Sequence, residues 1–266
     1  MPELPDLEVL KNNILKKFRG AEVTAIQARR NQAELEKALL KTKLVGITRR
    51  GKYLVLAFGD TVTDIKQELI LHLMLHGRLT STNSGTAAKG TQVLAITFDN
   101  KEDLRLDDRT FWSKFWLGVD GHLDKLGVEP DSDDFTFDYF YQKLQKSRGQ
   151  IKPLLMKQEF IAGLGNAYTD EALFKAKIRP DEKANKLSEA QAKSLWQAIK
   201  EVLPWGISEI EKAVGDQVLE DEDRKFMNVY RKENQPCPVC QTKIVQTRVG
   251  GRDTFYCPKC QKLNED

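Results

Sequence analysis

Apolar residues recur at helical spacing directly after the N-terminus. Four of them share one helical face: Leu7, Leu10, Ile14 and Phe18. Pro5 suits the first turn of a helix, where its missing N–H has no partner, and Asp6 has the side chain of a good N-cap. The pattern predicts a helix that is capped by Asp6 and stops at Gly20.

The next hundred residues carry short apolar or alternating runs, which indicate strands. Three runs are bounded by Gly, Asp or Asn: GKYLVLAFG (51–59), ELILHLML (68–75) and QVLAITFDN (92–100). The stretch TSTNSGTAAKG (80–90) is polar, has small side chains and is typical of a loop. We therefore expect an N-terminal β-sandwich with a leading helix.

The composition changes at GVEPDSDDF (127–135), which is acidic, contains proline and indicates a linker. From Phe135 to about Gly215 the apolar spacing becomes helical. The helical segments are FDYFYQKLQKS, IKPLLMKQ, TDEALFKAK and SEAQAKSLWQAIKEVL. The predicted class is α+β with several domains: a sandwich (1–121), a linker (122–134), a helical domain (135–228) and a C-terminal hairpin (229–266).

Composition narrows the class without identifying a partner. A chain of 266 residues with 40% hydrophobic and 30% charged residues buries a core and ordinarily forms two or three domains. No apolar run approaches the roughly 18 residues of a membrane span, and the N-terminus lacks the layout of a signal peptide. We expect a globular, cytoplasmic protein. A net charge of +3 is too small to indicate a polyanion partner by itself.

All four cysteines lie near the C-terminus, in the spacing C-x2-C-x16-C-x2-C. They are Cys237, Cys240, Cys257 and Cys260. Two close pairs of thiolates suit tetrahedral zinc, and four cysteines leave no open position on the metal. Two disulfides are the alternative, but they need an oxidising compartment, and the preceding 236 residues contain no cysteine. The spacing predicts one structural zinc ion.

Two short strands joined by a glycine turn are predicted between the cysteine pairs. They cover Ile244–Val249 and Thr254–Tyr256, with the turn at Gly250 and Gly251. Arg252 lies at or just beyond this turn, so a zinc-bound hairpin would hold its guanidinium on a stiff support. A guanidinium fork suits a phosphate. An ordinary solvated arginine fits the same position.

A second candidate anion site lies in the helical domain. Gly163 and Gly165 flank the approach to Asn166, which opens a predicted helix whose N–H groups suit an anion. A tight corner between two helices is the alternative interpretation. Basic residues form three clusters in separate modules: Arg49-Arg50-Lys52, Lys146-Arg148-Lys152 and Arg248-Arg252. This distribution favours a nucleic-acid backbone bound in a cleft that the modules share.

Five ordered stretches resemble the formamidopyrimidine-DNA glycosylase and endonuclease VIII family of base-excision repair enzymes. They are PELPDLE (2–8), RRGKYLVL (49–56), DDRTF (107–111), IKPLLMKQEFIAGLGNAY (151–168) and GRDTFYCPKCQ (251–261). The resemblance implies a β-sandwich, a helix-two-turn-helix domain and a zinc-finger hairpin. It also implies a monomer that binds damaged double-stranded DNA, without membrane association and in the nucleoid region of the cytoplasm.

The resemblance further implies a bifunctional DNA glycosylase and abasic-site lyase that acts on oxidised or ring-opened bases. After removal of Met1, the secondary amine of Pro2 would attack C1′ of the damaged nucleotide, with Glu3 as general acid. An α-amino group has a pKa near 8, against about 10.4 for lysine, so more of it is unprotonated at neutral pH. The family pattern associates Lys52 with β-elimination and Arg252 with δ-elimination and phosphate binding.

Other positions match the DNA contacts of the family. Arg148 and Asn166 fall on positions that contact the backbone around the lesion. Arg109 and Phe111, in DDRTF, fall on positions that enter the duplex beside the opposite strand. An enzyme that evicts a base from the stack has to fill the gap, which gives these residues a physical purpose.

The sequence departs from the family pattern in three places. Leu75 stands where methionine is common, and Met74 lies one residue earlier; an apolar wedge of either kind would serve. Asp6 replaces the usual glutamate and is a secondary carboxylate near the catalytic residues. Residues 211–230 are shorter and more acidic than the loop that closes over 8-oxoguanine. This predicts weaker recognition of 8-oxoguanine than of formamidopyrimidines, oxidised pyrimidines or abasic sites.

Two other functions fit parts of the sequence. A protein that binds lesions or branched DNA without cutting could use the same scaffold, although binding alone needs neither Pro2 nor Glu3. An RNA-binding zinc-ribbon protein predicts equal affinity for RNA and a dispensable N-terminus. The preferred lesion, the base opposite it and the extent of elimination are not predicted by the sequence.

Overall fold

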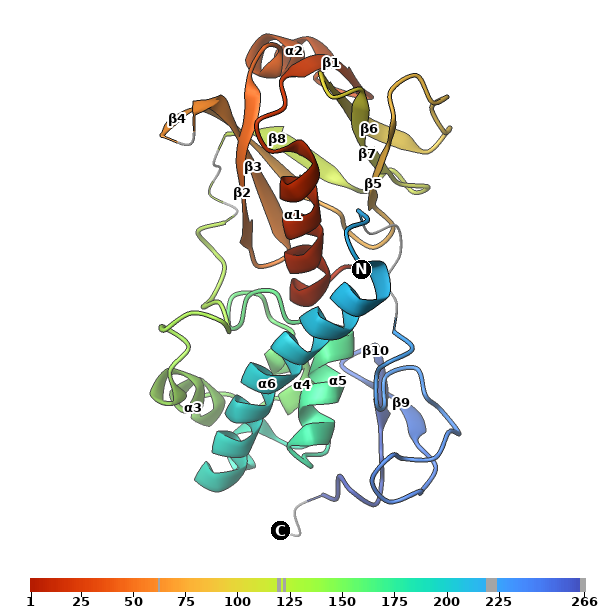
Figure 1. Ribbon diagram of the computed structural model, residues 1–266. Coiled ribbons are helices and arrows are strands. Elements are labelled where there is room, and N and C mark those ends of the chain that lie inside the picture. The colour runs from red at the N-terminus through yellow and green to blue at the C-terminus, as the bar shows by residue number, and fades with distance from the viewer. Residues whose placement is uncertain (62, 119–120, 122, 219–223, 264–266) are drawn as a thin grey trace. The chain divides into compact units, whose positions relative to one another are not determined.

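The computed structural model describes every residue except 62, 119–120, 122, 219–223 and 264–266 (Figure 1). The chain forms two compact units. The first unit contains residues 1–124 and 210–222, and the second contains residues 125–209 and 223–266. Among the described residues, none of the helices has the length and apolar character that crossing a membrane requires.

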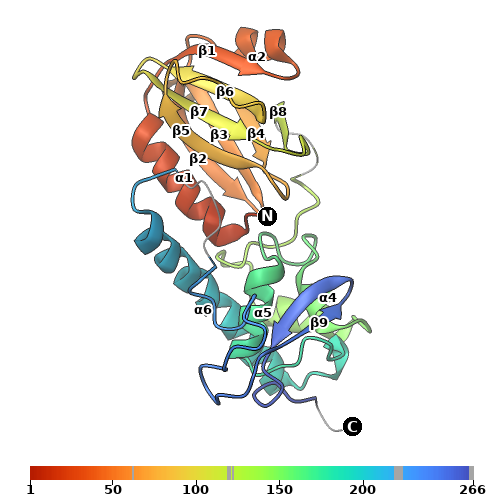
Figure 2. The same cartoon turned by 90° about the vertical axis from the view of Figure 1, so that its right-hand side faces the viewer.

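The first unit is a β-sandwich with two helices. The helices are α1 (Leu4–Phe18) and α2 (Gln32–Leu39), and the strands are β1 (Val23–Ala28), β2 (Lys43–Arg50), β3 (Tyr53–Thr61), β4 (Asp64–His72), β5 (Arg78–Asn83), β6 (Gln92–Phe98), β7 (Glu102–Asp107) and β8 (Lys114–Leu117). They form two antiparallel sheets, ordered β1-β6-β7-β5 and β2-β3-β4-β8. Figure 2 shows one sheet in front of the other. The predicted sandwich with a leading helix is confirmed.

One apolar core joins both sheets and α1. Leu56 of β3 and Leu94 of β6 come from different sheets, and Ile14 comes from α1; all three are at most 2% exposed. Val218, near the end of the first unit, packs on the same core. The apolar positions that predicted the leading helix are therefore the face that α1 buries.

Helix α1 starts earlier than its sequence predicted. Glu3 is the N-cap, with extended backbone, and Pro5 lies in the first turn. Asp6 is the third helical residue, and its Oδ2 accepts a hydrogen bond from the N–H of Glu3 at 2.8 Å. The prediction that Asp6 is the N-cap is wrong, because Glu3 and Asp6 form a capping box around the first turn. The predicted stop is confirmed, since Gly20 has a φ of +83°.

The stretch 80–90 is only partly a loop. Its first four residues belong to strand β5, which pairs with β7, and Thr80 is 7% exposed. The prediction of a loop is wrong for these four residues, because threonine is β-branched and favours a pleated strand even in a polar sequence.

The second unit is helical and carries the C-terminal hairpin. Its elements are α3 (Phe137–Gln145), α4 (Ile151–Leu155), α5 (Asn166–Lys175), a 3₁₀ turn (Ala184–Lys186), α6 (Glu189–Val214, of which residues up to 209 belong to this unit), β9 (Val245–Val249) and β10 (Arg252–Tyr256). The ring of Phe140 lies 5.7 Å from those of Phe135 and Phe160 in the core. The helical pattern predicted for residues 135–215 is confirmed.

The C-terminal hairpin also follows its prediction. Strands β9 and β10 are antiparallel, with Val249 opposite Arg252. Gly250 and Gly251 form the turn with φ values of +58° and +75°. Residues that carry a Cβ atom rarely adopt these φ values, so glycine is favoured at both positions of this two-residue hairpin turn.

Candidate functional site

The first helix holds the N-terminal residues of the first unit in place. Pro2 and Glu3 are buried, and Glu3 is only 4% exposed. The capping box connects Glu3 to Asp6, which is fully buried. The start of a rigid helix therefore fixes a proline and a carboxylic acid next to each other.

Arg49 connects the turn between β2 and β3 to α1. Its Nε donates to Glu8 of α1 at 2.9 Å, and its Nη1 donates to the carbonyl of Gly51 at 3.2 Å. Lys52 follows in the same turn and is 7% exposed. Arg49 therefore holds this turn against α1, and its side chain is only 4% exposed.

His72, at the end of β4, lies within electrostatic reach of Lys52. Its ring packs on Tyr53 with the centroids 4.5 Å apart, and its Nδ1 accepts from the N–H of Met74 at 3.2 Å. Burial, followed by the positive charges of Lys52 and Lys114, lowers the pKa of His72 to about 4. The imidazole is therefore neutral near pH 7.

Two loops of the first unit, residues 73–77 and 108–113, are bonded to each other; they are called the paired loops below. Ser113 Oγ donates to the carbonyl of Leu73 at 3.1 Å. Nη2 of Arg109 lies 3.3 Å from Nδ1 of His76. A Cβ atom on Gly77 would clash with both the Leu73 carbonyl and the Ser113 hydroxyl, so the close approach requires glycine.

Asp108 organises the second of the paired loops. It is 1% exposed. Its carboxylate accepts hydrogen bonds from the N–H of Thr110 (2.8 Å), Trp112 (3.0 Å) and Ser113 (2.7 Å), and from the hydroxyls of Thr110 and Ser113 (2.7 Å each). Burial alone would raise the pKa of Asp108, but the hydrogen bonds from Ser113 and Thr110 hold it below its ordinary value. The loop is thus built around a carboxylate that stays ionised.

The paired loops expose several apolar side chains. Leu75 is 48% exposed and Phe111 is 44% exposed, whereas Met74 is half-buried. Met74 and Phe111 both have positive φ values, of +54° and +56°. Leu75 is therefore better placed than Met74 to contact a partner.

A basic groove adjoins the paired loops. It has a volume of about 430 Å³ and is lined by His76, Arg78, Thr80, Lys89, Thr91, Asp107 and Arg109. Three of these side chains are permanently cationic near pH 7 and only one is anionic, which suits a phosphate backbone.

In the second unit, the start of α5 is joined to the C-terminal hairpin. Asn166 is the first helical residue after the N-cap Gly165, and its Nδ2 donates to the carbonyl of Asp253 at 2.9 Å. Arg252, the first residue of β10, is exposed and lies one residue before that carbonyl. Asn166 and Arg252 are therefore brought into one neighbourhood.

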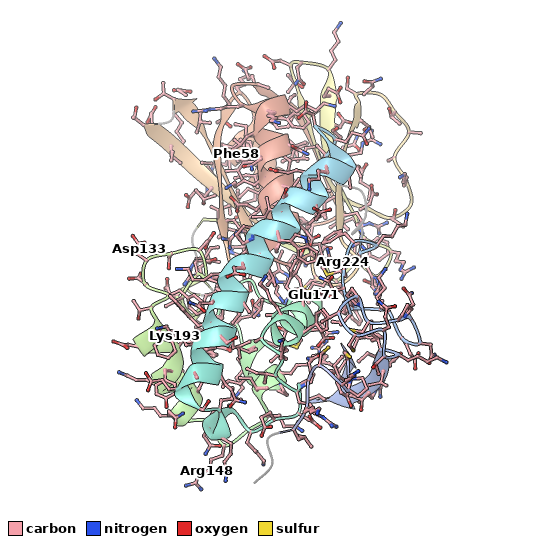
Figure 3. The ribbon with its side chains drawn as sticks, turned by 60° about the horizontal axis from the view of Figure 1, so that its bottom comes forward. Phe58, Asp133, Arg148, Glu171, Lys193 and Arg224 are labelled. Carbon is pink, nitrogen blue, oxygen red and sulfur yellow. The ribbon has the colours of Figure 1, made fainter. Side chains whose placement is uncertain are left out.

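Lys152 has a different environment from the one that its sequence suggested. It is fully buried, and its Nζ lies 2.7 Å from Oδ1 of the equally buried Asp170. The sequence grouped Lys152 with Lys146 and Arg148 as a basic cluster, but its side chain is buried against Asp170, 18 residues later in the chain, and is not available to a polyanion. Arg148, by contrast, is exposed and points away from the ribbon (Figure 3).

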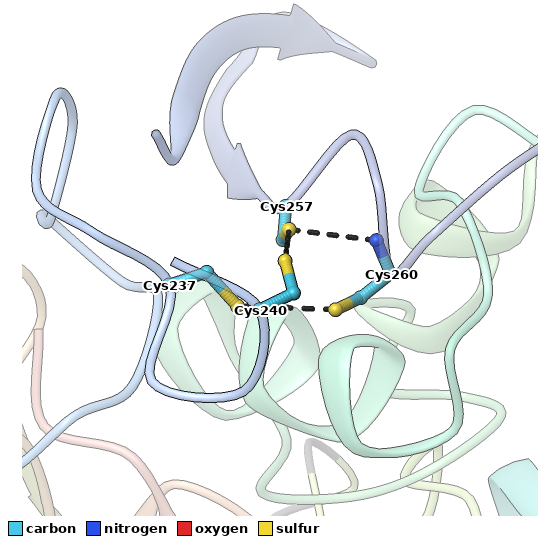
Figure 4. A group of neighbouring side chains, drawn as sticks. All are labelled: Cys237, Cys240, Cys257 and Cys260. Carbon is cyan, nitrogen blue, oxygen red and sulfur yellow. Dashed lines mark hydrogen bonds between the residues drawn. The ribbon is translucent and has the colours of Figure 1, made fainter. Parts of the chain in front are cut away.

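The four cysteines gather at the base of the hairpin (Figure 4). Their Sγ atoms all lie within 4.8 Å of one another, with Cys237 to Cys260 at 3.9 Å and Cys240 to Cys257 at 3.4 Å. Zinc bound tetrahedrally at about 2.3 Å holds its sulfur atoms about 3.8 Å apart. The donor set and its spacing fit one structural zinc ion, and four thiolates leave no position for a substrate.

Sequence reasoning missed the supporting roles of Arg49 and Asp108 in the first unit and of Asp170 in the second unit. Arg49 and Asp170 act through partners that are distant in sequence, whereas the partners of Asp108 lie two to five residues after it. One signal was available for Asp108: an Asp followed by Thr and Ser at two and five residues is typical of side-chain-capped turns.

Sequence models of three protein domains match the chain. "Formamidopyrimidine-DNA glycosylase N-terminal domain" matches residues 1–113, "Formamidopyrimidine-DNA glycosylase H2TH domain" matches residues 126–217, and "Zinc finger found in FPG and IleRS" matches residues 234–263. The matches follow the sandwich, the helices and the cysteine hairpin in order.

Whole proteins match over nearly the full length. The formamidopyrimidine-DNA glycosylase of Pelotomaculum thermopropionicum is 33% identical, over 99% of this chain and 100% of its own. The Lactococcus lactis protein Fpg, solved with DNA containing an abasic site, has a TM-score of 0.87 and 30% identity, over 98% of this chain and 99% of its own. The same protein, solved with DNA containing an oxidised pyrimidine, has a TM-score of 0.87 and 32% identity, over 98% of this chain and 100% of its own.

Proposed function

Because the chain belongs to the formamidopyrimidine-DNA glycosylase family, we propose that it excises oxidised or ring-opened bases from double-stranded DNA and cleaves the abasic site that results. The observation that carries this proposal is the capping box of Glu3 and Asp6, which fixes the residues beside Pro2 at the start of α1. Mere DNA binding does not need a preorganised acid next to an N-terminal proline.

In the proposed reaction, removal of Met1 frees the secondary amine of Pro2. Its nitrogen forms a bond to C1′ of the damaged nucleotide as the bond from C1′ to the base breaks. Glu3 protonates the ring oxygen, which opens the sugar and leaves a positively charged iminium. That charge withdraws electrons, so a proton leaves C2′ and the 3′ phosphate is expelled.

The other site residues have supporting tasks in this proposal. Lys52 assists β-elimination, and Arg49 positions it by holding the turn against α1. Arg252, on the stiff zinc hairpin, binds a phosphate and assists δ-elimination, with Asn166 beside it. Arg148 contacts the backbone from the surface of its unit. A zinc ion held by the four cysteines would stabilise the hairpin, and its four thiolate ligands would leave no position for a substrate.

The paired loops are the proposed wedge. Arg109 and Phe111 enter the duplex beside the opposite strand, and Leu75 supplies the apolar third contact because it is the exposed one of the pair Leu75 and Met74. The residues that evict and replace a nucleotide thus stand on a loop that Asp108 keeps rigid.

We propose formamidopyrimidines, oxidised pyrimidines and abasic sites as better substrates than 8-oxoguanine. The support is the short acidic segment 211–230, part of which, residues 219–223, lies outside the described residues. A panel of duplexes, each with one lesion, measures the preference. We also propose that the protein acts as a monomer with the chromosomal DNA in the cytoplasm, which sedimentation and cell imaging test.

Borohydride trapping on DNA with an abasic site tests the central proposal. Reduction of the iminium by borohydride is expected to link the protein to DNA covalently, and Pro2→Gly is expected to abolish the adduct. Pro5→Ala is the matched control and should keep it. An intact protein whose mature N-terminus begins at Pro2 and which forms no adduct would instead be the non-catalytic binder.

A further inference from the structure

The paired loops carry an aromatic side chain that the proposed function does not use. Trp112 is 61% exposed, more than Phe111 at 44% or Leu75 at 48%. Exposed apolar side chains that occur together commonly mark a binding site, and Trp112 shares the paired loops with the exposed Phe111 and Leu75.

The backbone that bears Trp112 is held on both sides. Its own N–H donates to Oδ2 of Asp108 at 3.0 Å, and the N–H of Ser113 donates to the same oxygen at 2.7 Å. Arg30 adds a bond from Nη2 to the carbonyl of Ser113 at 2.9 Å. The ring is therefore presented from a preorganised position, which lowers the entropy cost of binding.

One face of the Phe111 ring is covered by a neighbouring guanidinium. The guanidinium of Arg29 lies 3.9 Å from the centroid of its ring. Arg29 is itself fixed by hydrogen bonds to the carbonyls of Gly90 at 2.6 Å and Gln92 at 2.8 Å. One face of Phe111 is thus covered, and Trp112 provides the larger accessible aromatic surface of the loop.

The surroundings of Trp112 identify the chemistry of the partner. The basic groove of about 430 Å³ begins at Arg109, three residues away, and contains Arg78 and Lys89. Lys114, two residues after Trp112, is also exposed. A partner that carries flat aromatic groups on a negatively charged backbone fits this combination, and a nucleic-acid strand has both.

We propose that Trp112 stacks on the nucleobase that faces the lesion in the opposite strand. This inference rests on the proposed function, because only eviction of the damaged nucleotide leaves that base without a partner. Every base has a π-face, so stacking is tolerant of sequence. Trp112 therefore makes lesion binding only weakly dependent on which base stands opposite.

Removing the Trp112 side chain from the protein, the opposite base from the DNA, or both tests this contact. The probe is a fluorescent duplex that carries a tetrahydrofuran abasic analogue, with each of the four bases or a second tetrahydrofuran opposite. Stacking on one base contributes about 5- to 150-fold in affinity. Trp112→Ala is expected to weaken binding at least about fivefold with any base opposite, and to leave binding unchanged when the opposite base is missing.

Two further variants separate stacking from other effects. Ile65 is 49% exposed on β4, so Ile65→Ala removes an exposed apolar side chain outside the paired loops and should bind like the wild type. Trp112→Phe keeps an aromatic ring and should retain most of the affinity.

The inference is overturned if Trp112→Ala binds every duplex as the wild type does, or if it loses the same factor with and without the opposite base. Normal borohydride trapping by the wild type in either case leaves the proposed function intact. A wild type that neither traps nor prefers the tetrahydrofuran duplex to undamaged DNA overturns both proposals.

Discussion

The Nζ atom of Lys152 lies 2.7 Å from Oδ1 of Asp170, and neither side chain is exposed to solvent. Lys152 also donates to the carbonyl of Asp253 at 3.0 Å and to the hydroxyl of Thr254 at 2.9 Å. Oδ2 of Asp170 accepts from the N–H of Phe255 at 3.0 Å. A buried charge pair from α4 and α5 therefore fixes β10, the strand that begins with the proposed phosphate-binding arginine.

We predict that Lys152→Ala destabilises the second unit strongly. Removing one partner of a buried pair leaves the other charge uncompensated, at a cost of about 3–5 kcal/mol. Chemical denaturation measures this loss. Lys175→Ala is the control, because Lys175 and its partner Glu201 have side chains 49% and 58% exposed, and such a pair contributes less than about 1 kcal/mol.

The same variant should show a distinctive pH dependence. Burial raises the pKa of Asp170 to about 7, and the charge of Lys152 opposes that rise. Without Lys152, the folded-state pKa of Asp170 rises further above its unfolded value. A raised pKa favours folding at low pH and loses that contribution as pH increases. The Tm deficit of Lys152→Ala should be larger at pH 8 than at pH 5; equal deficits would contradict this account.

The hairpin turn predicts a difference between the variants of its two glycines. An ideal Cβ on Gly250 would lie 2.5 Å from Cγ of Pro153 in α4, whereas a Cβ on Gly251 meets nothing within 4 Å. Both residues have positive φ, so alanine costs about 1 kcal/mol at either position. Gly250→Ala should therefore lower the Tm more than Gly251→Ala and should reduce cleavage of abasic DNA more. Indistinguishable variants would show that Pro153 does not support the turn.

Several features of the fold were predicted correctly from the sequence, whereas the environment of Lys152 was not. The zinc site, the Gly250-Gly251 turn and the apolar face of α1 were all predicted, because each has a recognisable spacing of residues in the sequence. Lys152 was misread because its charge partner is distant in sequence and becomes close only through packing. A lysine next to other basic residues looks solvated unless that partner is known.

Some residues of the candidate site were also predicted from the sequence, and others were not. The resemblance supplied the roles of Pro2 and Glu3, whereas the spacing of the four cysteines supplied the zinc ligands. The supporting role of Arg49 could not be predicted, because its partner Glu8 lies 41 residues away in sequence, whereas the role of Asp108 had a local signal in Thr110 and Ser113. Asp6 was recognised as a helix-start residue, but its place in the capping box depended on where the first turn begins.

Another prediction concerns His72. Burial and the charges of Lys52 and Lys114 lower its pKa to about 4, so the folded protein prefers the neutral ring. A lowered pKa gives stability above the unfolded value of about 6.5, and this is lost as pH falls toward 4. We predict that Tm falls over this window and that His72→Gln flattens the fall, by about 1–2 kcal/mol of unfolding free energy after allowance for partial exposure.

Measurements above pH 7 provide the internal control for that prediction. There His72 is neutral in folded and unfolded chains, so the two proteins should have parallel profiles. A variant whose Tm declines as steeply as that of the wild type between pH 6.5 and 4 would assign the decline to other groups.

The last prediction concerns Asp108, which accepts hydrogen bonds from Thr110, Trp112 and Ser113. Asn in its place has one acceptor oxygen and turns an NH2 group toward these donors. Leaving buried donors unsatisfied costs about 1–3 kcal/mol each, so Asp108→Asn should lower the unfolding free energy. It should also weaken binding to tetrahydrofuran DNA about tenfold, because the paired loops are no longer held rigid.

Asp107→Asn is the matched control. Asp107 accepts one bond from Thr91 at 3.2 Å and lines the basic groove. Its neutralisation should cost little stability and should not weaken DNA binding; if the two variants bind equally well, the rigid loop does not contribute to affinity.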